Sequence, residues 1–247
     1  MIVGVIPARY AASRLPGKPL VDLCGQSMIE RVWRGAIACA ELDRVIIATD
    51  DARVVAEADR IGAEVVMTDP ALPSGTDRCY AAIASMESTP EIVINIQGDE
   101  PLLQPGVLTD LVHRLKQGSA DVATPVTRIH SAEDLHDPNI VKVAATVEGR
   151  AVYFSRSPIP HVRNVPIEQW LRHATFWKHI GIYAYRRSAL ERHVQLAPSA
   201  LEQLEFLEQL RLVADGAVFA CVETSAHFIS VDTPSDADAV RAFLTRV

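Results

Sequence analysis

The sequence lacks the features that mark several specialised protein classes. Its 247 residues include only four cysteines and no C-x-x-C pair, so reduced thiols in a cytosolic protein are expected rather than disulfides or zinc. No apolar run approaches the ~18 residues that span a bilayer, and no basic segment precedes the first apolar run, as a secretory signal would require. The net charge of −7 argues against a general nucleic-acid binder.

Two common nucleotide-binding fingerprints are missing as well. Neither G-x-x-x-x-G-K-[S/T] nor G-x-G-x-x-G follows the first strand-like run, which weakens the cases for a P-loop NTPase and for a dinucleotide oxidoreductase. The composition is that of an ordinary globular protein, with 49% apolar and 22% charged residues. The length therefore allows one large α/β domain or two small ones.

Strand and helix patterns alternate through the first half of the chain. Apolar, β-branched runs predict buried strands at 2–7, 44–49 and 92–96 and a further strand at 63–67, and the segments between them have helical spacing. This alternation predicts a mostly parallel central sheet flanked by helices. After Asp121 the pattern becomes mixed, with further strands and helices expected at 122–128, 141–147, 152–155, 180–185, 187–195, 202–212, 218–222, 227–231 and from Pro234.

The loop after the first strand carries three cations, Arg9, Arg14 and Lys18. They are interleaved with small residues that let a ligand approach the backbone, namely Ala8, Ala11, Ala12, Ser13 and Gly17. Ligands of open α/β sheets bind beyond the carboxyl ends of the strands, where this loop lies. A solvated basic loop is the alternative, but the unbroken strand directly before the cations favours a polyphosphate site.

Two aspartates directly follow predicted strands. Asp99 lies in the sequence QGDEP (97–101) and Asp232 in VDTP (231–234). Mg²⁺ commonly takes one or two protein carboxylates and completes its shell with phosphates and water, so a pair converging on one cleft would suit nucleotidyl transfer. The alternatives are a turn cap for Asp99 and an N-cap of the last helix for Asp232, and for Asp232 alone the cap is favoured.

Eight motifs in this chain follow one another in an order that resembles the 3-deoxy-manno-octulosonate cytidylyltransferases, the CMP-Kdo synthetase family. The resemblance spans nearly the whole chain, although the stretch 161–177 matches no family pattern. The motifs are IPARYAASRLPGKPL (6–20), ATDD (48–51), MTDPALPSGTDR (67–78), NIQGDEP (95–101), YFSRSPIP (153–160), HIGIYAYRR (179–187), LEQLR (207–211) and VDTPSD (231–236).

The resemblance implies a nucleotidyltransferase (Rossmann-like) α/β fold in a single domain, 1–247. Residues 1–120 would form a CTP-binding portion, and residues 121–247 a mixed portion for sugar binding and dimerisation. The implied reaction is transfer of CMP from CTP to the anomeric 2-hydroxyl of 3-deoxy-manno-octulosonate (Kdo), with release of pyrophosphate, for lipopolysaccharide inner-core synthesis. The implied cofactor is Mg²⁺, as one or two ions, and the implied protein is a cytoplasmic homodimer without membrane insertion.

Two alternatives remain beside that reading. One is cytidylyl transfer to another sugar acid, either 8-amino-Kdo or a sialic acid, and the other is a non-catalytic nucleotide-binding regulator on the same fold. The segment 156–177, with its prolines and tryptophans, is expected to leave the sheet as a lid or as a subunit contact.

The resemblance also assigns roles to individual residues. The expected metal ligands are Asp99 and Asp232, which with Lys18 form the expected catalytic set. Without the motifs, His179 and Tyr183 would be interpreted as core residues and Glu208 as a solvated helix charge. The implied nucleotide-binding residues are Ala8, Arg9, Arg14, Lys18, Ser74, Gly75 and Arg78. The implied sugar-binding residues are Gln97, Arg156, His179, Tyr183, Glu208 and Gln209.

Overall fold

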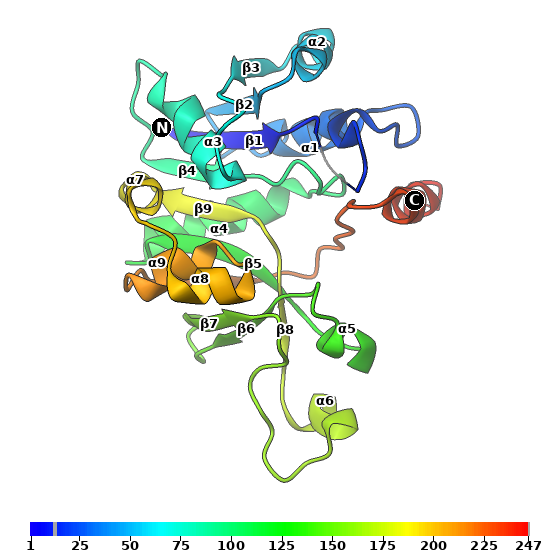
Figure 1. Ribbon diagram of the computed structural model, residues 1–247, viewed down its shortest axis with the longest axis vertical. Coiled ribbons are helices and arrows are strands. Elements are labelled where there is room, and N and C mark those ends of the chain that lie inside the picture. Colours follow the sequence, from blue (N-terminus) through cyan, green and yellow to red (C-terminus); the bar gives the residue numbers. More distant parts are fainter. Residues whose placement is uncertain (12–13, 247) are drawn as a thin grey trace.

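The computed structural model describes residues 1–11 and 14–246. Ala12 and Ser13, counted above among the small residues of the first loop, lie outside the described residues. All strands of the described part join one mixed sheet in the order β3-β2-β1-β4-β9-β5-β8-β6-β7, and β10 pairs with β5 (Figure 1). The strands are β1 (Ile2–Ala8), β2 (Arg44–Thr49), β3 (Glu64–Met67), β4 (Ile92–Asn95), β5 (Val122–Arg128), β6 (Lys142–Ala145), β7 (Ala151–Ser155), β8 (Trp177–His179), β9 (Tyr183–Arg186) and β10 (Phe219–Glu223).

Helices cover both faces of this sheet. One core holds apolar side chains of α1, α2 and α4, and the other holds those of α3, α7 and α9. Along β1, Ile2 and Ile6 belong to the first core while Val3 and Val5 belong to the second, so the strand is buried on both faces as predicted. The helices are α1 (Met28–Ile37), α2 (Ala52–Ile61), α3 (Gly75–Ala84), α4 (Pro105–Gln117), α5 (Ala132–His136), α6 (Trp170–His173), α7 (Arg187–Gln195), α8 (Ala200–Glu205), α9 (Gln209–Ala214) and α10 (Pro234–Leu244), with short 3-10 turns at η1 (Lys18–Leu20) and η2 (Ile167–Gln169).

The predicted change of pattern after Asp121 is confirmed. Strands β1 to β4 are parallel neighbours, whereas β9 returns antiparallel between β4 and β5. Antiparallel pairs of β8 with β5 and β6, and of β6 with β7, extend the sheet on that side. The α/β fold class, a central sheet flanked by helices with a mixed second portion, is therefore the observed one.

Three element predictions in the second half were wrong. The single helix expected at 202–212 is two helices, α8 and α9, because Phe206 adopts a left-handed conformation (φ 52°, ψ 47°) that ends α8. The strand expected at 180–185 begins later, since β9 spans Tyr183–Arg186, and β8 (Trp177–His179), just before the expected range, was not predicted. Residues 227–231 form no strand: Val231 donates its N–H to Asp99 O (2.9 Å), which ties the segment to a loop.

The segment 156–177 does leave the body of the molecule. Figure 1 shows α6 and its flanking loops projecting away from the sheet, beyond β6 and β7. Trp170 and Phe176 stack there (ring centroids 5.9 Å apart) and pack with Ile129 and Leu135 in a small separate core. This small core packs the projecting segment on itself and against the residues that follow β5.

The carboxyl ends of β1 and β4 meet at one edge, and a glycine lets the loop after β4 lie against β1. A side chain at Gly98 would place its Cβ 2.8 Å from Pro7 O, closer than any real contact. Glycine therefore allows the main chain at 97–99 to reach the end of β1. This brings Asp99 to the loop that carries Lys18.

Candidate active site

Lys18 and the two predicted metal ligands form one cluster at the carboxyl edge of the sheet. Lys18 Nζ donates to Asp99 Oδ2 (2.6 Å) and to Asp232 Oδ1 (2.8 Å), although these residues lie far apart in the chain. Burial disfavours the ammonium, but the two carboxylates outweigh it and raise the pKa of Lys18 above its usual value. Arg14 adds a third contact, with its guanidinium 3.1 Å from Asp232 Oδ2.

The alternative interpretation of Asp232 as a helix cap was wrong. The N-cap of α10 is Thr233, whose hydroxyl accepts from Asp236 N (3.3 Å) while the Asp236 carboxylate accepts from Thr233 N (2.8 Å). This capping box satisfies the helix end without the Asp232 side chain. The carboxylate of Asp232 is thus left to face Lys18 and Arg14.

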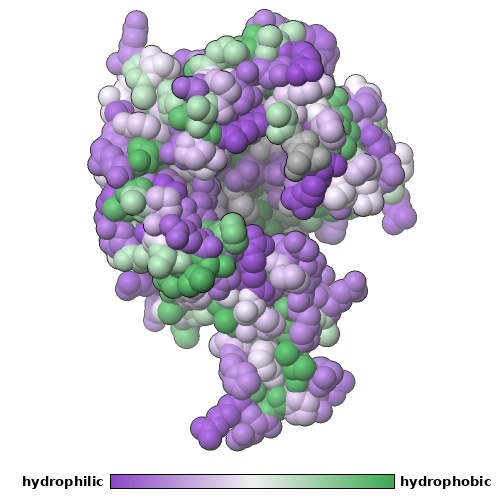
Figure 2. Space-filling view, viewed as in Figure 1, coloured by the Kyte–Doolittle hydropathy of each residue, from purple (hydrophilic) through white to green (hydrophobic). Residues whose placement is uncertain are grey.

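A first cavity, of about 240 Å³, lies between the first loop and the start of α3. Figure 2 shows this face of the molecule hollowed beyond the end of β1. Asp99 and Gln97 form one side of the cavity. Among the predicted nucleotide-binding residues, those that line it are Ala8, Arg9, Lys18, Gly75 and Arg78.

Arg78 is fully buried at the inner wall of the first cavity. Its guanidinium forms an ion pair with Asp50 (2.9 Å) and a hydrogen bond with Thr68, while Nε has no partner among the described residues. Burial lowers the pKa of Arg78, and Asp50 partly offsets that effect. An arginine with an unused donor at a cavity wall is suited to a ligand acceptor.

Ser74 and Arg9 take different positions around the same cavity. Ser74 is the N-cap of α3 and accepts from Asp77 N (3.1 Å), so it shapes the start of the helix. Gly75 follows it, and a Cβ there would lie 3.3 Å from Pro7 Cγ. Arg9 is exposed and its guanidinium donates to Leu72 O, which links the first loop to the loop before α3.

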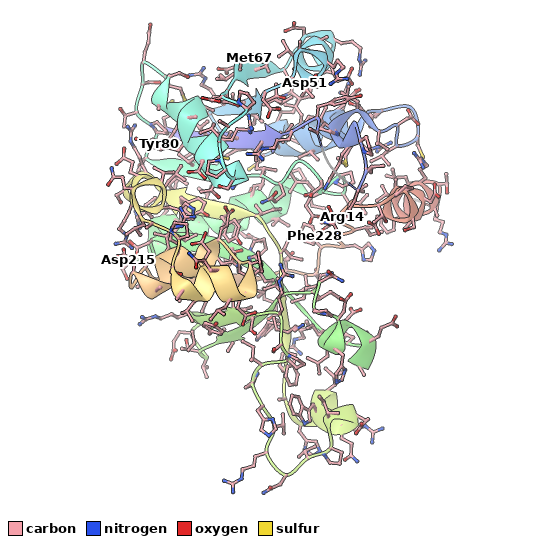
Figure 3. The ribbon with its side chains drawn as sticks, viewed as in Figure 1. Arg14, Asp51, Met67, Tyr80, Asp215 and Phe228 are labelled. Atoms are coloured by element: carbon pink, nitrogen blue, oxygen red, sulfur yellow. The ribbon has the colours of Figure 1, made fainter. Side chains whose placement is uncertain are left out.

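A second cavity, of about 640 Å³, shares Gln97 and Asp99 with the first. Asp232 and Phe228 also line it, and Figure 3 shows Arg14 and Phe228 on the same side of the molecule, next to α10. Asp99 therefore stands where two cavities meet. Five of the six predicted sugar-binding residues line this second cavity, namely Gln97, Arg156, His179, Tyr183 and Gln209.

His179 and Tyr183 form a neutral part of that wall. His179 Nε2 lies 3.0 Å from Thr124 Oγ1, and burial lowers the pKa of His179 to about 3. Burial likewise raises the pKa of Tyr183 well above its usual value. Both side chains therefore present uncharged, hydrogen-bonding rings to a ligand at neutral pH.

The guanidinium of Arg156 donates to main-chain oxygens, and no carboxylate of the described residues pairs with it. Nε donates to Glu205 O (2.7 Å), one terminal nitrogen to Pro138 O (2.9 Å), and the other to Phe206 O (3.3 Å). The Glu205 carboxylate accepts instead from Arg156 N (2.9 Å) and from Ser155 Oγ (2.7 Å). The guanidinium thus keeps its positive charge for an anionic ligand in the cavity.

Glu208 is the predicted sugar-binding residue that does not line the second cavity. Its carboxylate accepts from Thr76 Oγ1 (2.7 Å) on α3, behind the wall formed by Leu207 and Gln209. Burial raises the pKa of Glu208. In this structure it connects the segment before α9 to the helix that borders the first cavity.

Several residues of the second cavity escaped the sequence analysis, among them the charged Glu100 and Lys178. Both adjoin predicted residues, Asp99 and His179, so the motifs QGDEP and HIGIYAYRR contained or bordered them. Glu100 is 4% exposed, and burial, reinforced by Asp99, raises its pKa to about 8. No signal in the sequence distinguishes a buried Glu100 from an exposed one after the strand.

The described residues, 1–11 and 14–246, contain no cluster of three or more histidine, cysteine, aspartate or glutamate side chains that could hold a metal by themselves. The donor set at this edge is instead a pair of carboxylates that already converge on one cation, the Lys18 ammonium. Two carboxylates beside a phosphate-sized cavity match the sparse protein coordination that Mg²⁺ accepts.

Comparison with known proteins supports one family. A family model described as cytidylyltransferase matches residues 3–223. The chain is 43% identical to the 3-deoxy-manno-octulosonate cytidylyltransferase of Cytophaga hutchinsonii over 95% of its length and 94% of the relative's. It is 45% identical to the protein of the same name from Chromohalobacter salexigens, with 98% and 96% covered.

Solved structures agree with this finding. A CMP:2-keto-3-deoxy-manno-octonic acid synthetase complexed with CTP superposes with a TM-score of 0.91 at 41% identity, covering 99% of this chain and 98% of the other. A 4-diphosphocytidyl-2C-methyl-D-erythritol synthase from Anaerococcus prevotii, at 12% identity and a TM-score of 0.66, shares the fold alone.

Proposed function

The chain belongs to the 3-deoxy-manno-octulosonate cytidylyltransferase family. We propose that its first cavity binds CTP, that its second cavity binds Kdo, and that the two substrates react next to Asp99. The enzyme transfers CMP from CTP to the anomeric 2-hydroxyl of Kdo and releases pyrophosphate. The observation that carries the proposed site is the meeting of a cation-lined cavity and a polar, sugar-sized cavity at one carboxylate. Relatives of this name favour Kdo over a sialic acid or an 8-amino sugar as the acceptor.

The residues of the first cavity would bind and orient the nucleotide. Arg78, with its unused Nε, would donate to the cytosine, and Arg9, Arg14 and Lys18 would neutralise the phosphates. Transfer of this kind depends mostly on positioning and on charge neutralisation at the leaving group. These cations would therefore stabilise the charge that builds on pyrophosphate.

The residues of the second cavity would hold the sugar acid. Arg156 offers the charge for its carboxylate, while His179, Tyr183, Gln97 and Gln209 offer neutral hydrogen bonds to its hydroxyls. Such contacts would place the anomeric hydroxyl beside Asp99, where the two cavities meet. No side chain of the described part stands out as a general base for that hydroxyl.

Asp99 and Asp232 would hold Mg²⁺, since their carboxylates already enclose a cation between them. When bound, Mg²⁺ would polarise phosphate oxygens and lower the pKa of a coordinated hydroxyl. Once nucleotide and metal bind, the Lys18 ammonium would release the two aspartates and form ion pairs with the phosphates instead. The ammonium thus balances the carboxylates in the free enzyme and the phosphates in the complex.

Pyrophosphate release with purified protein, CTP, Kdo and Mg²⁺ tests the proposed function. We expect CTP to be preferred over ATP and GTP by about a thousandfold or more in kcat/KM, because a small cavity with a matched donor rejects a base that leaves Arg78 unpaired. A panel of Kdo, 8-amino-Kdo and sialic acid completes the assay. Comparable turnover with ATP and CTP would contradict the assignment of the first cavity.

A second prediction concerns Glu205, which fixes Arg156 without lining the cavity. In Glu205→Ala, Arg156 N and Ser155 Oγ lose their carboxylate partner, so the segment that carries the guanidinium loosens. We expect KM for Kdo to rise about tenfold, since a hydrogen bond to a charged group contributes about 1.5–3 kcal/mol. KM for CTP serves as the internal control, and an equal rise in both would show general destabilisation instead.

We also propose a cytoplasmic homodimer. None of the helices in residues 1–11 and 14–246 is long and apolar enough to cross a bilayer. Within the projecting segment 156–177 the first residue, Arg156, lines the second cavity, whereas residues 157–177 line neither cavity, which favours a subunit contact over a lid. We expect sedimentation at micromolar concentration to give the mass of a dimer, and a monomer there would refute this proposal.

A further inference from the structure

Glu100 is a buried acidic side chain on the second cavity with half of its hydrogen-bonding capacity unused. The side chain is 4% exposed and lines the cavity together with Asp99 and Gln97. One oxygen, Oε1, accepts from Ser230 Oγ. The other, Oε2, is buried and has no partner within residues 1–11 and 14–246.

An unused carboxyl oxygen at such a position is costly in the free protein. Leaving a buried polar group unpaired destabilises the folded protein, and native proteins rarely keep such a group without a reason. The main chain here is fixed by hydrogen bonds from Glu100 N to Gln97 O (3.3 Å) and from Leu103 N to Glu100 O (3.1 Å). This main chain and the hydrogen bond from Ser230 Oγ together hold the carboxyl group in the cavity wall.

The same cavity contains a second buried polar group that lacks a hydrogen-bond partner. Gln209 is 2% exposed, and no described residue accepts a hydrogen bond from its Nε2. Arg156 and Lys178 add positive charge to the wall. A ligand that satisfies all of these groups must carry a negative charge and several hydroxyls, because a hydroxyl can both donate and accept.

We propose that Glu100 determines specificity for the sugar acid by forming a hydrogen bond between its Oε2 and a hydroxyl of that substrate. This inference rests on the proposed function of the second cavity. It adds Glu100 to the substrate-contacting residues, between the reacting centre at Asp99 and the wall at Lys178. A sugar acid without the contacted hydroxyl would leave Oε2 unpaired and would be rejected.

If Glu100 had only a structural role, its variants would show a different pattern of kinetic effects. Through Oε1 and Ser230, Glu100 also anchors the connection that carries Asp232. If that anchor were its only role, Ser230→Ala would do as much damage as removal of the carboxyl group. The loss would then affect CTP, Kdo and the Mg²⁺ requirement together.

The test measures kcat/KM for Kdo, KM for CTP and the Mg²⁺ concentration for half-maximal turnover in three variants. Glu100→Met keeps the size of the side chain and removes its oxygens, and we expect kcat/KM for Kdo to fall about a hundredfold while KM for CTP stays within about twofold. Glu100→Gln keeps a polar atom at the position of Oε2, and we expect it to recover most of that loss. Ser230→Ala, at a residue that also lines the second cavity, removes the anchor and keeps the Glu100 carboxyl group, and it should lose much less, without a difference between the substrates.

Several outcomes overturn the inference. These are unchanged Kdo kinetics in Glu100→Met, an equal loss in Ser230→Ala, or a shift in the Mg²⁺ requirement that accounts for the loss. Should Glu100→Met fail to fold, Glu100→Asp retracts the carboxyl group from the cavity and is expected to show the same split between Kdo and CTP. Wild-type protein that releases no pyrophosphate from CTP and Kdo would refute the proposed function instead, before any variant is compared.

Discussion

Asn in place of Asp99 is expected to lower turnover by about a thousandfold or more while the protein stays folded, because a metal in this role supplies several kcal/mol of transition-state stabilisation. The residue stands where the two cavities meet and its carboxylate already binds a cation, Lys18. Asparagine keeps the shape of the side chain and removes its charge. The measurement is pyrophosphate release across a Mg²⁺ titration, together with the melting temperature.

Asp232→Asn is expected to have an effect of the same order, and it has a sharper interpretation. Asn caps helices about as well as Asp, so a capping residue would tolerate the change. Because Thr233 and Asp236 cap α10 by themselves, the helix should be unaffected in either case. A large loss of turnover with an unchanged melting temperature would thus be attributable to the cation site.

A matched control is available on the same helix. Asp238 is exposed and pairs with Arg241 (2.7 Å), so Asp238→Asn removes one negative charge without touching the cluster. It should retain near-normal turnover. Near-normal turnover in Asp99→Asn as well would remove the proposed metal site, and near-normal turnover in Asp232→Asn would leave Asp99 as its only protein ligand.

The first half of the fold was predictable because local pattern and tertiary environment agree there. The β-branched runs at Ile2–Ala8 and Arg44–Thr49 are buried on both faces, which is what such runs favour. The cation-lined loop and Asp99 follow from the rule that ligands bind beyond the carboxyl ends of strands. Their convergence on Lys18 is the physical result of that topology.

The second half was less predictable because tertiary contacts decide its local conformation. Phe206 ends the expected helix although phenylalanine rarely adopts a left-handed backbone conformation. In this conformation its carbonyl oxygen accepts a hydrogen bond from Arg156, a contact that the sequence pattern does not reveal. Residues 227–231 have strand-like composition, but Val231 donates its N–H to Asp99 O in the loop after β4 rather than to a neighbouring strand. Glu100 looks like a surface carboxylate in sequence, and its burial depends on the cavity around it.

Replacing Lys18 by methionine is expected to have two effects of opposite sign, because the ammonium has a different partner in each state. In the free enzyme it lies 2.6 Å from Asp99 and 2.8 Å from Asp232, where it occupies the space between the carboxylates. We expect its removal to tighten divalent-cation binding without nucleotide by about tenfold or more, because two close carboxylates lose their neutralising charge. Direct titration with Mg²⁺ or Mn²⁺ by calorimetry measures this effect.

Turnover of the same variant is expected to fall about a hundredfold or more, since a preorganised charge on the leaving group is lost. Lys116→Met is the control, because Lys116 is an exposed lysine that pairs with Glu41 (2.7 Å) on the surface, and it should change neither quantity. If Lys18→Met bound the metal no more tightly than wild type, the ammonium and the metal would not compete for the same carboxylates. If it bound the metal more tightly and also kept full turnover, Lys18 would be only a counter-ion of the free enzyme, with no role at the phosphates.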